Sequence, residues 1–473
     1  MNFVQVEYPA FLALLLAVYW ALPHRRWQNL LLVVASAVFY GWVHPWFLIL
    51  LYGSSILDFS LAQAIERFPR RRWTFVGLSA FANLSLLAYF KYAGFFVDNV
   101  RAVLESAGVP GDLGTLDILL PVGISFYTFQ TLGYTVDVAR GELKARTSFL
   151  DYVLYVSFFA QLVAGPIERS TRLLPQIERD RRWSWTMARS GVGLALWGGF
   201  KKLVVADSIA PFVDKVYVLD DPAGPLLWAA TAGFMLQIYA DFSGYTDLAR
   251  GSARLLGFEL QENFNAPFLA TTTSEFWQRW HMSLSFWIRD YVLGPLVGDS
   301  PGGVSRFRFF WATVLTFVLI GFWHGASWNF VLFGLYHGLW VIVYGLVARR
   351  IPVSVRAMPG GRVLAAAFHL LAVGLVGSML FREQHLDRIV EHLTRNPLSA
   401  GPAEWVATVV LLSMTAALAA PLVFAWAWGE WVRPRVQTSP WYLPIETTTW
   451  AMWCVAMYVF YRVTAQDFVY FQF

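Results

Sequence analysis

The sequence is poor in cysteine and in charged residues. Its 473 residues include a single cysteine, Cys454, which excludes a disulfide framework, and the position of this thiol inside an apolar run argues against a cysteine nucleophile. Charged residues make up 14% of the chain, against about 25% in an ordinary soluble domain. The composition therefore excludes a typical soluble protein and indicates a protein that lies largely in a lipid bilayer.

Sequence motifs of several enzyme classes are also missing. The chain contains no glycine-rich phosphate-binding loop, no HExxH or CxxC spacing of metal ligands and no G-x-S-x-G nucleophile motif. This excludes the usual nucleoside-triphosphatase, zinc-peptidase and serine-hydrolase interpretations, and we predict no metal site. The basic residues are scattered between apolar runs, so no nucleic-acid partner is expected either.

Long apolar runs are what the sequence has instead. Hydrophobic residues make up 57% of the chain, and runs of about 18 to 25 residues recur from Tyr8 onwards. Each run is long enough to cross a hydrocarbon core of about 30 Å as a helix. We predict an all-α polytopic membrane bundle, with residues 1–473 as one integral membrane domain of about 11 to 13 membrane segments. Some segments contain glycine, proline and polar residues and are expected to be re-entrant or interfacial.

The longest uncharged segment contains two histidines, and the first of them, His324, is a functional candidate. No Asp, Glu, Lys or Arg occurs between Arg308 and Arg349, a stretch that predicts two membrane crossings, and the motif GFWHGASWNF places His324 deep in the first crossing, before its far end. Gly321 and Gly325 flank the histidine and are expected to let a neighbouring backbone or an elongated substrate come close. The segment alone leaves two alternatives open: a histidine that bonds a neighbouring helix, or a catalytic histidine.

A second histidine occurs in the stretch TTTSEFWQRWHMSLSFWIRDY. The pattern Thr272-x-x-Glu275 is a capping box, which predicts that a helix begins there. In one continuous helix, His281 would share a face with the large apolar side chains of Trp277 and Leu284. We therefore expect an amphipathic helix at the membrane, with His281 pointing inward.

His337 provides a comparison with these two histidines. It lies about 13 residues beyond His324, so on one continuous helix, at about 100° per residue, it would point about 220° away from it. We therefore expect His337 to be a packing histidine that does not share the site of His324. His369 is interpreted in the same way.

Other polar and small residues lie at predicted membrane depth. Ionisable groups inside a membrane are functional candidates by default, because burying them in hydrocarbon is costly. Together these residues indicate a polar cavity or tunnel inside the bundle. The further candidates for the walls of that tunnel are Gln130, Asp241, Tyr245, Trp323, Gly325 and Asn329.

At these residues the sequence resembles the membrane-bound O-acyltransferase family, in particular its bacterial branch that acetylates polysaccharides such as alginate. The resemblance covers the chain from about residue 118 to the C-terminus, and the order of its motifs makes it specific. The matching pieces are LPVGISFYTFQTLGYTVDVARGE, QLVAGPIER, QIYADFSGYTDLARG, NFNAPFLATTTSEFWQRWHMSLSFWIRDY, GFWHGASWNF, LFRE and FVYFQF.

The resemblance implies a bundle of about eleven membrane helices around a tunnel. His324 resembles the essential histidine of the family and His281 the second hallmark histidine. An acyl group, expected to be acetyl from acetyl-CoA or another cytoplasmic thioester, would cross the cytoplasmic (inner) membrane and be placed on an extracytoplasmic polysaccharide. No tightly bound cofactor is expected. A separate extracytoplasmic esterase-like partner protein would act on the polysaccharide side.

The chemistry that we expect is general base catalysis. His324 would remove the proton from an acceptor hydroxyl as it attacks the thioester carbonyl, because an imidazole can accept a proton near neutral pH. His281 would orient the acceptor or stabilise the developing charge, with Asn329 as a possible helper.

Three alternatives remain open at this point. Within the family, the motifs do not choose between polysaccharide acetylation, aminoacyl (D-alanyl) transfer to cell-wall polymers and peptidoglycan O-acetylation. A transporter or flippase would belong to another class, and would be expected to show paired charges and half-symmetric repeats. A structural scaffold of a secretion complex would not need two inward histidines.

Overall fold

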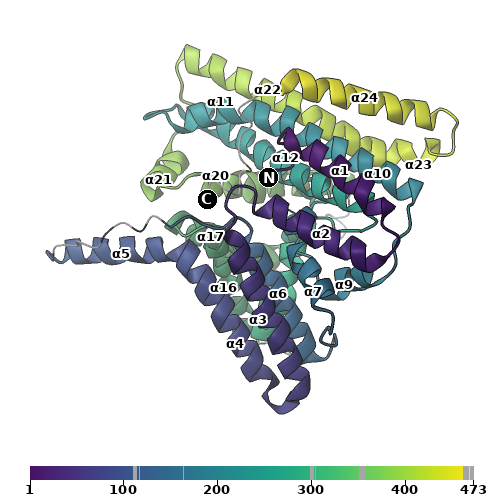
Figure 1. The fold of residues 1–473 in the computed structure, drawn as a ribbon. Helices are drawn as coiled ribbons and strands as arrows, with labels where there is room; N and C mark the ends of the chain where they lie inside the picture. Colours follow the sequence, from purple (N-terminus) through teal and green to yellow (C-terminus); the bar gives the residue numbers. More distant parts are fainter. Residues whose placement is uncertain are drawn as a thin grey trace. The chain divides into compact units, whose positions relative to one another are not determined.

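The structure is a computed structural model in which all regular elements are helical (Figure 1). Within the described residues the one β feature is an isolated antiparallel bridge between Phe264 and Trp280. The prediction of an all-α protein is therefore confirmed for the part of the chain that the structure describes, which comprises residues 1–109, 114, 116, 118–162, 165–298, 303, 305–350, 358–461 and 468.

The chain forms two compact units, one of Met1–Val192 with Ala249–Gln261 and one of Gly193–Leu248 with Glu262–Phe473. Helices α10 (Trp185–Gly199) and α12 (Gly224–Leu255) carry residues of both units, and η denotes a short 3₁₀ or π segment. The other elements of the first unit are α1 (Glu7–Ala21), α2 (Arg25–Tyr40), α3 (Phe47–Arg67), η1 (Pro69–Arg71), α4 (Arg72–Leu87), η2 (Ala88–Tyr92), α5 (Ala93–Ser106), α6 (Ile124–Arg140), α7 (Phe149–Ser157), α8 (Phe159–Leu162) and α9 (Ser170–Glu178).

The second unit contains all the residues of the candidate site described below. Its elements are η3 (Phe200–Ala206), α11 (Asp207–Tyr217), η4 (Pro267–Leu269), α13 (Thr273–Arg279), α14 (Met282–Ile288), η5 (Arg289–Leu293), α15 (Gly294–Val297), α16 (Arg306–His324), α17 (Trp328–Ala348), α19 (Pro359–His369), η6 (Leu370–Leu375), α20 (Val376–Arg382), α21 (Leu386–Thr394), α22 (Pro402–Ala427), η7 (Trp428–Val432), α23 (Arg433–Val436) and α24 (Tyr442–Phe460).

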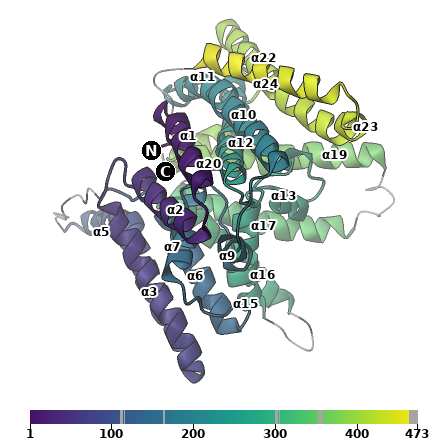
Figure 2. The same ribbon diagram turned by 45° about the vertical axis from the view of Figure 1, so that its right-hand side comes forward.

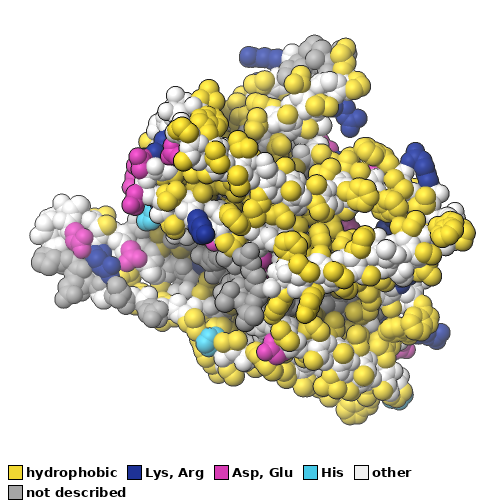
Figure 3. Space-filling model, turned by 90° about the horizontal axis from the view of Figure 1, so that it is seen from above, with side chains coloured by type: hydrophobic (Ala, Val, Ile, Leu, Met, Phe, Trp, Pro, Cys, Tyr) yellow, Lys and Arg dark blue, Asp and Glu magenta, His cyan; other side chains and the backbone are white. Residues whose placement is uncertain are grey.

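The protein is a multi-pass membrane protein by the length and composition of its helices. Apolar side chains predominate on the face drawn in Figure 3. Exposed hydrophobic residues such as Phe81 of α4 and Val406 of α22 have the environment expected of lipid-facing positions, since 72% and 64% of their surface is exposed. Six helical stretches of the described chain are long and apolar enough to span a bilayer, namely Phe47–Arg67, Pro69–Ser106, Arg306–His324, Trp328–Ala348, Pro359–Arg382 and Pro402–Val436.

Helices α16 and α17 form an antiparallel hairpin in the second unit (Figure 2). The Ser305 hydroxyl caps the start of α16 by accepting a hydrogen bond from the Arg308 amide at 3.1 Å. Where the two helices cross, a Cβ added to Gly321 would collide with the carbonyl oxygen of Phe330, and one added to Gly325 would collide with the Phe330 ring. Of the two expected neighbours of these glycines, another backbone or an elongated substrate, it is α17 that occupies the space beside them.

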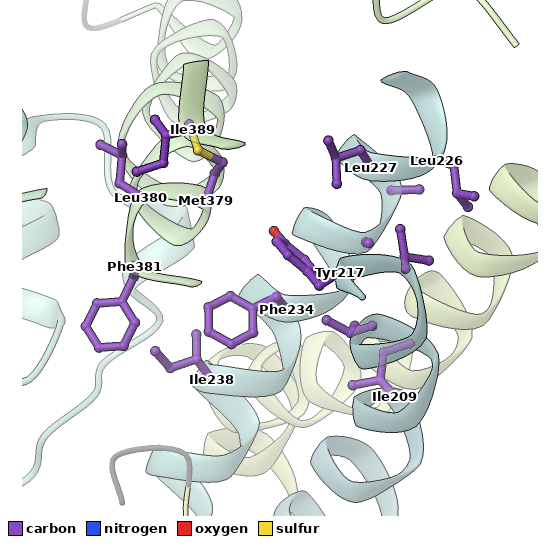
Figure 4. Close-up of a cluster of buried hydrophobic side chains, with 14 of the residues drawn as sticks. Ile209, Tyr217, Leu226, Leu227, Phe234, Ile238, Met379, Leu380, Phe381 and Ile389 are labelled. Atoms are coloured by element: carbon purple, nitrogen blue, oxygen red, sulfur yellow. The ribbon is translucent and has the colours of Figure 1, made fainter. Parts of the chain in front are cut away.

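A hydrophobic core joins α11 and α12 to α20 and α21. Figure 4 shows Phe381 of α20 facing Phe234 and Ile238 of α12. All three side chains are buried. Phe381 and Ile238 also line the cavity described next, so this core positions one wall of the candidate site.

Candidate active site

The helix that begins in the TTTSEF stretch starts where the sequence predicts. The Thr272 hydroxyl accepts a hydrogen bond from the Glu275 amide at 3.1 Å, as in a capping box. The reciprocal half of the box is displaced by one residue, because the Glu275 carboxylate accepts from the Thr271 amide at 2.7 Å rather than from Thr272. A salt bridge from Glu275 to Arg279, at 2.7 Å, stabilises the short helix α13 that follows.

His281 breaks this helix, so the prediction of one continuous helix is wrong there. Its φ angle of 42° places it in the left-handed region, between the end of α13 and the start of α14. A non-glycine residue adopts this conformation only where its surroundings enforce it. Here Asn263 does so: its backbone carbonyl accepts from the Met282 amide at 3.0 Å, and its side-chain carbonyl accepts from the Ser283 hydroxyl at 2.6 Å.

The expectation that His281 points inward is confirmed, because only 2% of its surface is exposed. Its ring lies edge-on to Phe242, with ring centres 4.7 Å apart, and 6.2 Å from the ring of Trp323. Burial lowers the pKa of His281 from 6.5 to about 3. The imidazole is therefore neutral at physiological pH and has one N–H donor and one acceptor nitrogen.

His324 is the last residue of α16, not a residue before the far end of that helix as expected. Gly325 follows in extended conformation and α17 begins at Trp328. The imidazole is buried, with 8% of the residue exposed, and its ring centre lies 5.2 Å from that of Phe381 and 4.9 Å from that of Trp323. At the C-terminal end of a helix, the partial negative charge of the backbone carbonyls favours a cation.

Both histidines line one cavity of about 50 Å³. Its walls are mainly aromatic and aliphatic, and the described residues that form them include no Asp, Glu, Lys or Arg. The polar members are three histidines and two serines. The lining residues are Ile238, Phe268, Phe276, Trp277, Trp280, His281, Leu284, Ser285, Ile320, His324, Phe333, His337, Val373, Gly374, Gly377, Ser378 and Phe381.

The third histidine of the cavity is His337, which contradicts the prediction that it lies away from His324. The prediction assumed one continuous helix, whereas the chain reverses at residues 325–327 and α17 runs back along α16. The ring of Phe333 connects the two imidazoles, with centres 6.0 Å from His324 and 4.5 Å from His337. His369, by contrast, is absent from the described walls of the cavity and bonds to protein atoms, as a packing histidine should.

Three of the other candidates lie close to His324 in the chain. The ring centre of Trp323 lies 6.2 Å from that of His281 and 4.9 Å from that of His324. Asn329 is fully buried, and its amide accepts from the Ser327 hydroxyl and donates to the carbonyl of Leu380 at 3.2 Å. Neither Trp323 nor Asn329 belongs to the described lining of the cavity, and Gly325 packs against α17 instead.

The remaining candidates have other surroundings. Asp241 forms a buried salt bridge with Lys202 at 2.9 Å. The ring of Tyr245 lies 5.6 Å from the Lys202 ammonium. Gln130 is buried in α6, a helix of the first unit. The structure thus brings together His281 and His324 among the candidates, and adds His337 and Phe381, which the sequence reasoning did not propose. Two features of the sequence could have pointed to these residues. His337 repeats the His-Gly pair of residues 324–325 at residues 337–338, and Phe381 lies in the LFRE motif.

Comparisons with known proteins show which proteins this chain resembles. The model of the MBOAT, membrane-bound O-acyltransferase, family matches residues 139–368, which include all three histidines. The chain is similar to the probable alginate O-acetylase AlgI of Azotobacter vinelandii, with 37% identity over 382 residues, or 80% of this chain and 74% of the relative.

Two further relatives are named for polymers other than alginate. The peptidoglycan O-acetyltransferase of Helicobacter pylori is 34% identical over 350 residues, 67% of this chain and 64% of the relative. The teichoic acid D-alanyltransferase of Bacillus subtilis is 30% identical over 244 residues, 47% of this chain and 58% of the relative.

Proposed function

The chain belongs to the membrane-bound O-acyltransferase family and is an O-acyltransferase, and we propose that it moves an acetyl group from acetyl-CoA towards the hydroxyl groups of an extracytoplasmic polysaccharide, with alginate as the first candidate. The observation that carries the proposal is that His281 and His324, on separate elements, line the same apolar cavity. Identity and coverage are higher for the alginate O-acetylase of Azotobacter vinelandii than for the D-alanyltransferase of Bacillus subtilis.

The size and charge of the cavity support acetyl as the transferred group. Each water-sized group needs about 10 to 15 Å³ of such space, so a cavity of about 50 Å³ has room for the three heavy atoms of an acetyl group but not for a long acyl chain. A D-alanyl group carries an ammonium, and the described walls contain no carboxylate to pair with it. An uncharged two-carbon group suits these walls better.

In the mechanism that we propose, His324 is the general base. It accepts the proton of the acceptor hydroxyl while the hydroxyl oxygen bonds to the thioester carbonyl carbon. The C–S bond then breaks, the thiolate of coenzyme A leaves and receives that proton, and the acetyl ester remains on the acceptor. The helix end beneath His324 would stabilise the transient imidazolium. Neutral His281 would donate a hydrogen bond to the acceptor or to the developing oxyanion.

The proposal includes the setting of the reaction. About eleven membrane helices would surround a tunnel that leads to the cavity, and the six candidate spans support the membrane part of this arrangement. We place the protein in the cytoplasmic membrane, where the thioester donor is available on one side. A separate extracytoplasmic esterase-like protein would complete the transfer to the polysaccharide.

The test uses an alginate-producing Azotobacter vinelandii strain that lacks its own alginate O-acetylase. The full-length chain, His324→Ala and the matched control His369→Ala are each expressed in it. The acetyl content of the alginate and the incorporation of label from radiolabelled acetyl-CoA by isolated membranes are measured. We expect acetylation with the unmodified chain and with His369→Ala, and a decrease of about a thousandfold with His324→Ala.

Two results would contradict the proposal. The first is full acetylation by His324→Ala at equal amounts of membrane-inserted protein, which would remove His324 from the chemistry. The second is a chain that leaves alginate unmodified and labels another cell-wall polymer, which would point to one of the alternatives within the family.

A further inference from the structure

The imidazole of His337 is held firmly in the wall of the cavity. The residue is 1% exposed and lies in α17, and its ring is edge-on to Trp277, Phe333 and Tyr336, with ring centres 5.1, 4.5 and 5.2 Å away. These contacts leave little freedom for the ring to turn. Its orientation is therefore set by protein packing before any substrate binds.

Gly377 of α20 packs against the imidazole of His337 in addition to the three aromatic rings. A Cβ added to Gly377 would lie 2.7 Å from Nε2 and 2.9 Å from Cε1 of His337, closer than real Cβ contacts allow. The absence of a side chain there is what lets α20 approach the edge of the imidazole. Gly377 and the neighbouring Ser378 also line the cavity, so the histidine and the helix that fits against it belong to the same wall.

The hydrogen bonding of His337 differs from that of a packing histidine in the same unit. Both ring nitrogens of His369 have protein partners, the carbonyl oxygen of Ala365 at 2.7 Å and the hydroxyl of Thr273 at 3.2 Å. For Nδ1 of His337, no partner occurs among the described residues. A polar atom buried without a partner is costly, so a ligand or a water that bonds Nδ1 would be favourable.

The surroundings of His337 also determine which kind of ligand it can bind. Because no charged side chain lies among the described cavity walls, the imidazole is expected to be neutral and to offer one N–H donor and one acceptor nitrogen. A neutral donor in an apolar pocket suits an uncharged oxygen acceptor. The carbonyl oxygen of a short acyl thioester is such a group.

We propose that His337 is a third histidine of the acyl-binding site, which donates a hydrogen bond to the carbonyl oxygen of the acyl group. The proposal rests on the function proposed above. During transfer no covalent bond to His337 forms or breaks: its N–H stays in place and the hydrogen bond strengthens as the carbonyl oxygen becomes an oxyanion, while His324 accepts the proton of the acceptor. His337 would then contribute to binding of the acyl group and to stabilisation of the transition state.

The experiment compares His337→Phe with His337→Asn and His337→Gln. Phenylalanine keeps an aromatic ring at this position and removes both nitrogens, whereas the two amides retain a polar atom near the position of Nδ1 or Nε2. Initial rates of label transfer from radiolabelled acetyl-CoA are measured in membranes of the Azotobacter vinelandii strain described above, per amount of inserted protein, over a range of acetyl-CoA concentrations. This yields kcat and KM separately.

We expect kcat/KM to fall about 10- to 100-fold for His337→Phe, and at least one amide variant to recover most of that loss. Transfer by His337→Phe at the rate of the unmodified chain would overturn the proposal. So would a loss that is the same for Phe, Asn and Gln, because a purely structural role would be insensitive to the retained polar atom.

A second variant covers the case in which His337→Phe does not accumulate in the membrane. Gly377→Ala retains the histidine, but the added methyl group displaces its imidazole ring. We expect this displacement to lower kcat/KM about tenfold. Unchanged kinetics of this variant would count against the proposal. His324→Ala, measured in parallel, separates the two proposals. An active His324→Ala contradicts the proposed function itself, whereas an inactive His324→Ala beside a fully active His337→Phe contradicts only the role of His337.

Discussion

Two buried polar clusters of the second unit each contain a residue that the sequence analysis proposed as a candidate, and they differ in the structure. Around η3, Lys202 forms salt bridges with Asp207 at 2.7 Å and with Asp241 at 2.9 Å, and all three residues are buried. In the cavity, three histidines line an apolar space whose described walls include no charged residue. In the first cluster one cation is shared by two carboxylates, while the residues of the second line a space that a small molecule can occupy. A polar residue at membrane depth is therefore not by itself a functional residue.

The largest effect that would test this comparison is on stability. Lys202→Met leaves Asp207 and Asp241 buried without their cation, which is expected to destabilise the fold by about 3 to 5 kcal/mol. The measurement is the unfolding temperature of the purified protein in detergent. Adding Asp207→Asn and Asp241→Asn to Lys202→Met should restore most of the lost stability. If Lys202→Met alone does not lower the unfolding temperature, the cluster does not stabilise the fold.

The matching change in the cavity should affect turnover instead. His281→Asn removes the imidazole but retains a residue type that tolerates the left-handed conformation, so the bend between α13 and α14 should persist. We expect turnover of acetyl-CoA to fall about 100-fold while the unfolding temperature changes by only a few degrees. If His281→Asn lowers the unfolding temperature strongly but leaves turnover per folded molecule normal, then the cavity histidines stabilise the fold as the Lys202 cluster does, and the two clusters do not differ in role.

The helix hairpin that positions His324 gives a smaller effect. Gly321→Ala places a methyl group against the Phe330 carbonyl and should destabilise the protein by about 1 to 3 kcal/mol, with some loss of activity because His324 is displaced. The matched control is Gly345→Ala in α17, where no atom lies within 4 Å of the added methyl group. Thermal unfolding of both variants measures the difference, and equal stability would argue against close packing at Gly321.

The smallest expected effect concerns the size of the acyl group. Phe381→Leu shortens a side chain of the cavity wall. It should raise the ratio of propionyl to acetyl transfer by between several-fold and about tenfold, because one methylene in an apolar pocket is worth about 1 to 3 kcal/mol. Competition between propionyl-CoA and acetyl-CoA measures the ratio independently of the total activity. If the ratio does not change, the cavity does not hold the acyl group.

The local features of the site were predictable because they depend on neighbouring residues. Uncharged runs of sufficient length determine the hairpin helices, and the Thr272 cap determines where α13 begins. The burial of His281 also followed from local periodicity, although its helix breaks. That break depends on Asn263, which bonds to the bend from 20 residues earlier in the chain, and the helical periodicity around His281 does not indicate it.

By itself the sequence determined the helical class and the membrane character, since these follow from composition and run length, and its short motifs singled out His281 and His324 as candidates. Only the tertiary structure decided which polar residues meet. The reversal at residues 325–327 brings His337 back to His324, the ion pairs of Lys202 satisfy Asp241, and α17 fills the space beside Gly321 and Gly325. The physical reason is that a cavity forms where segments far apart in the chain pack together, and this packing depends on long-range contacts that no single segment contains.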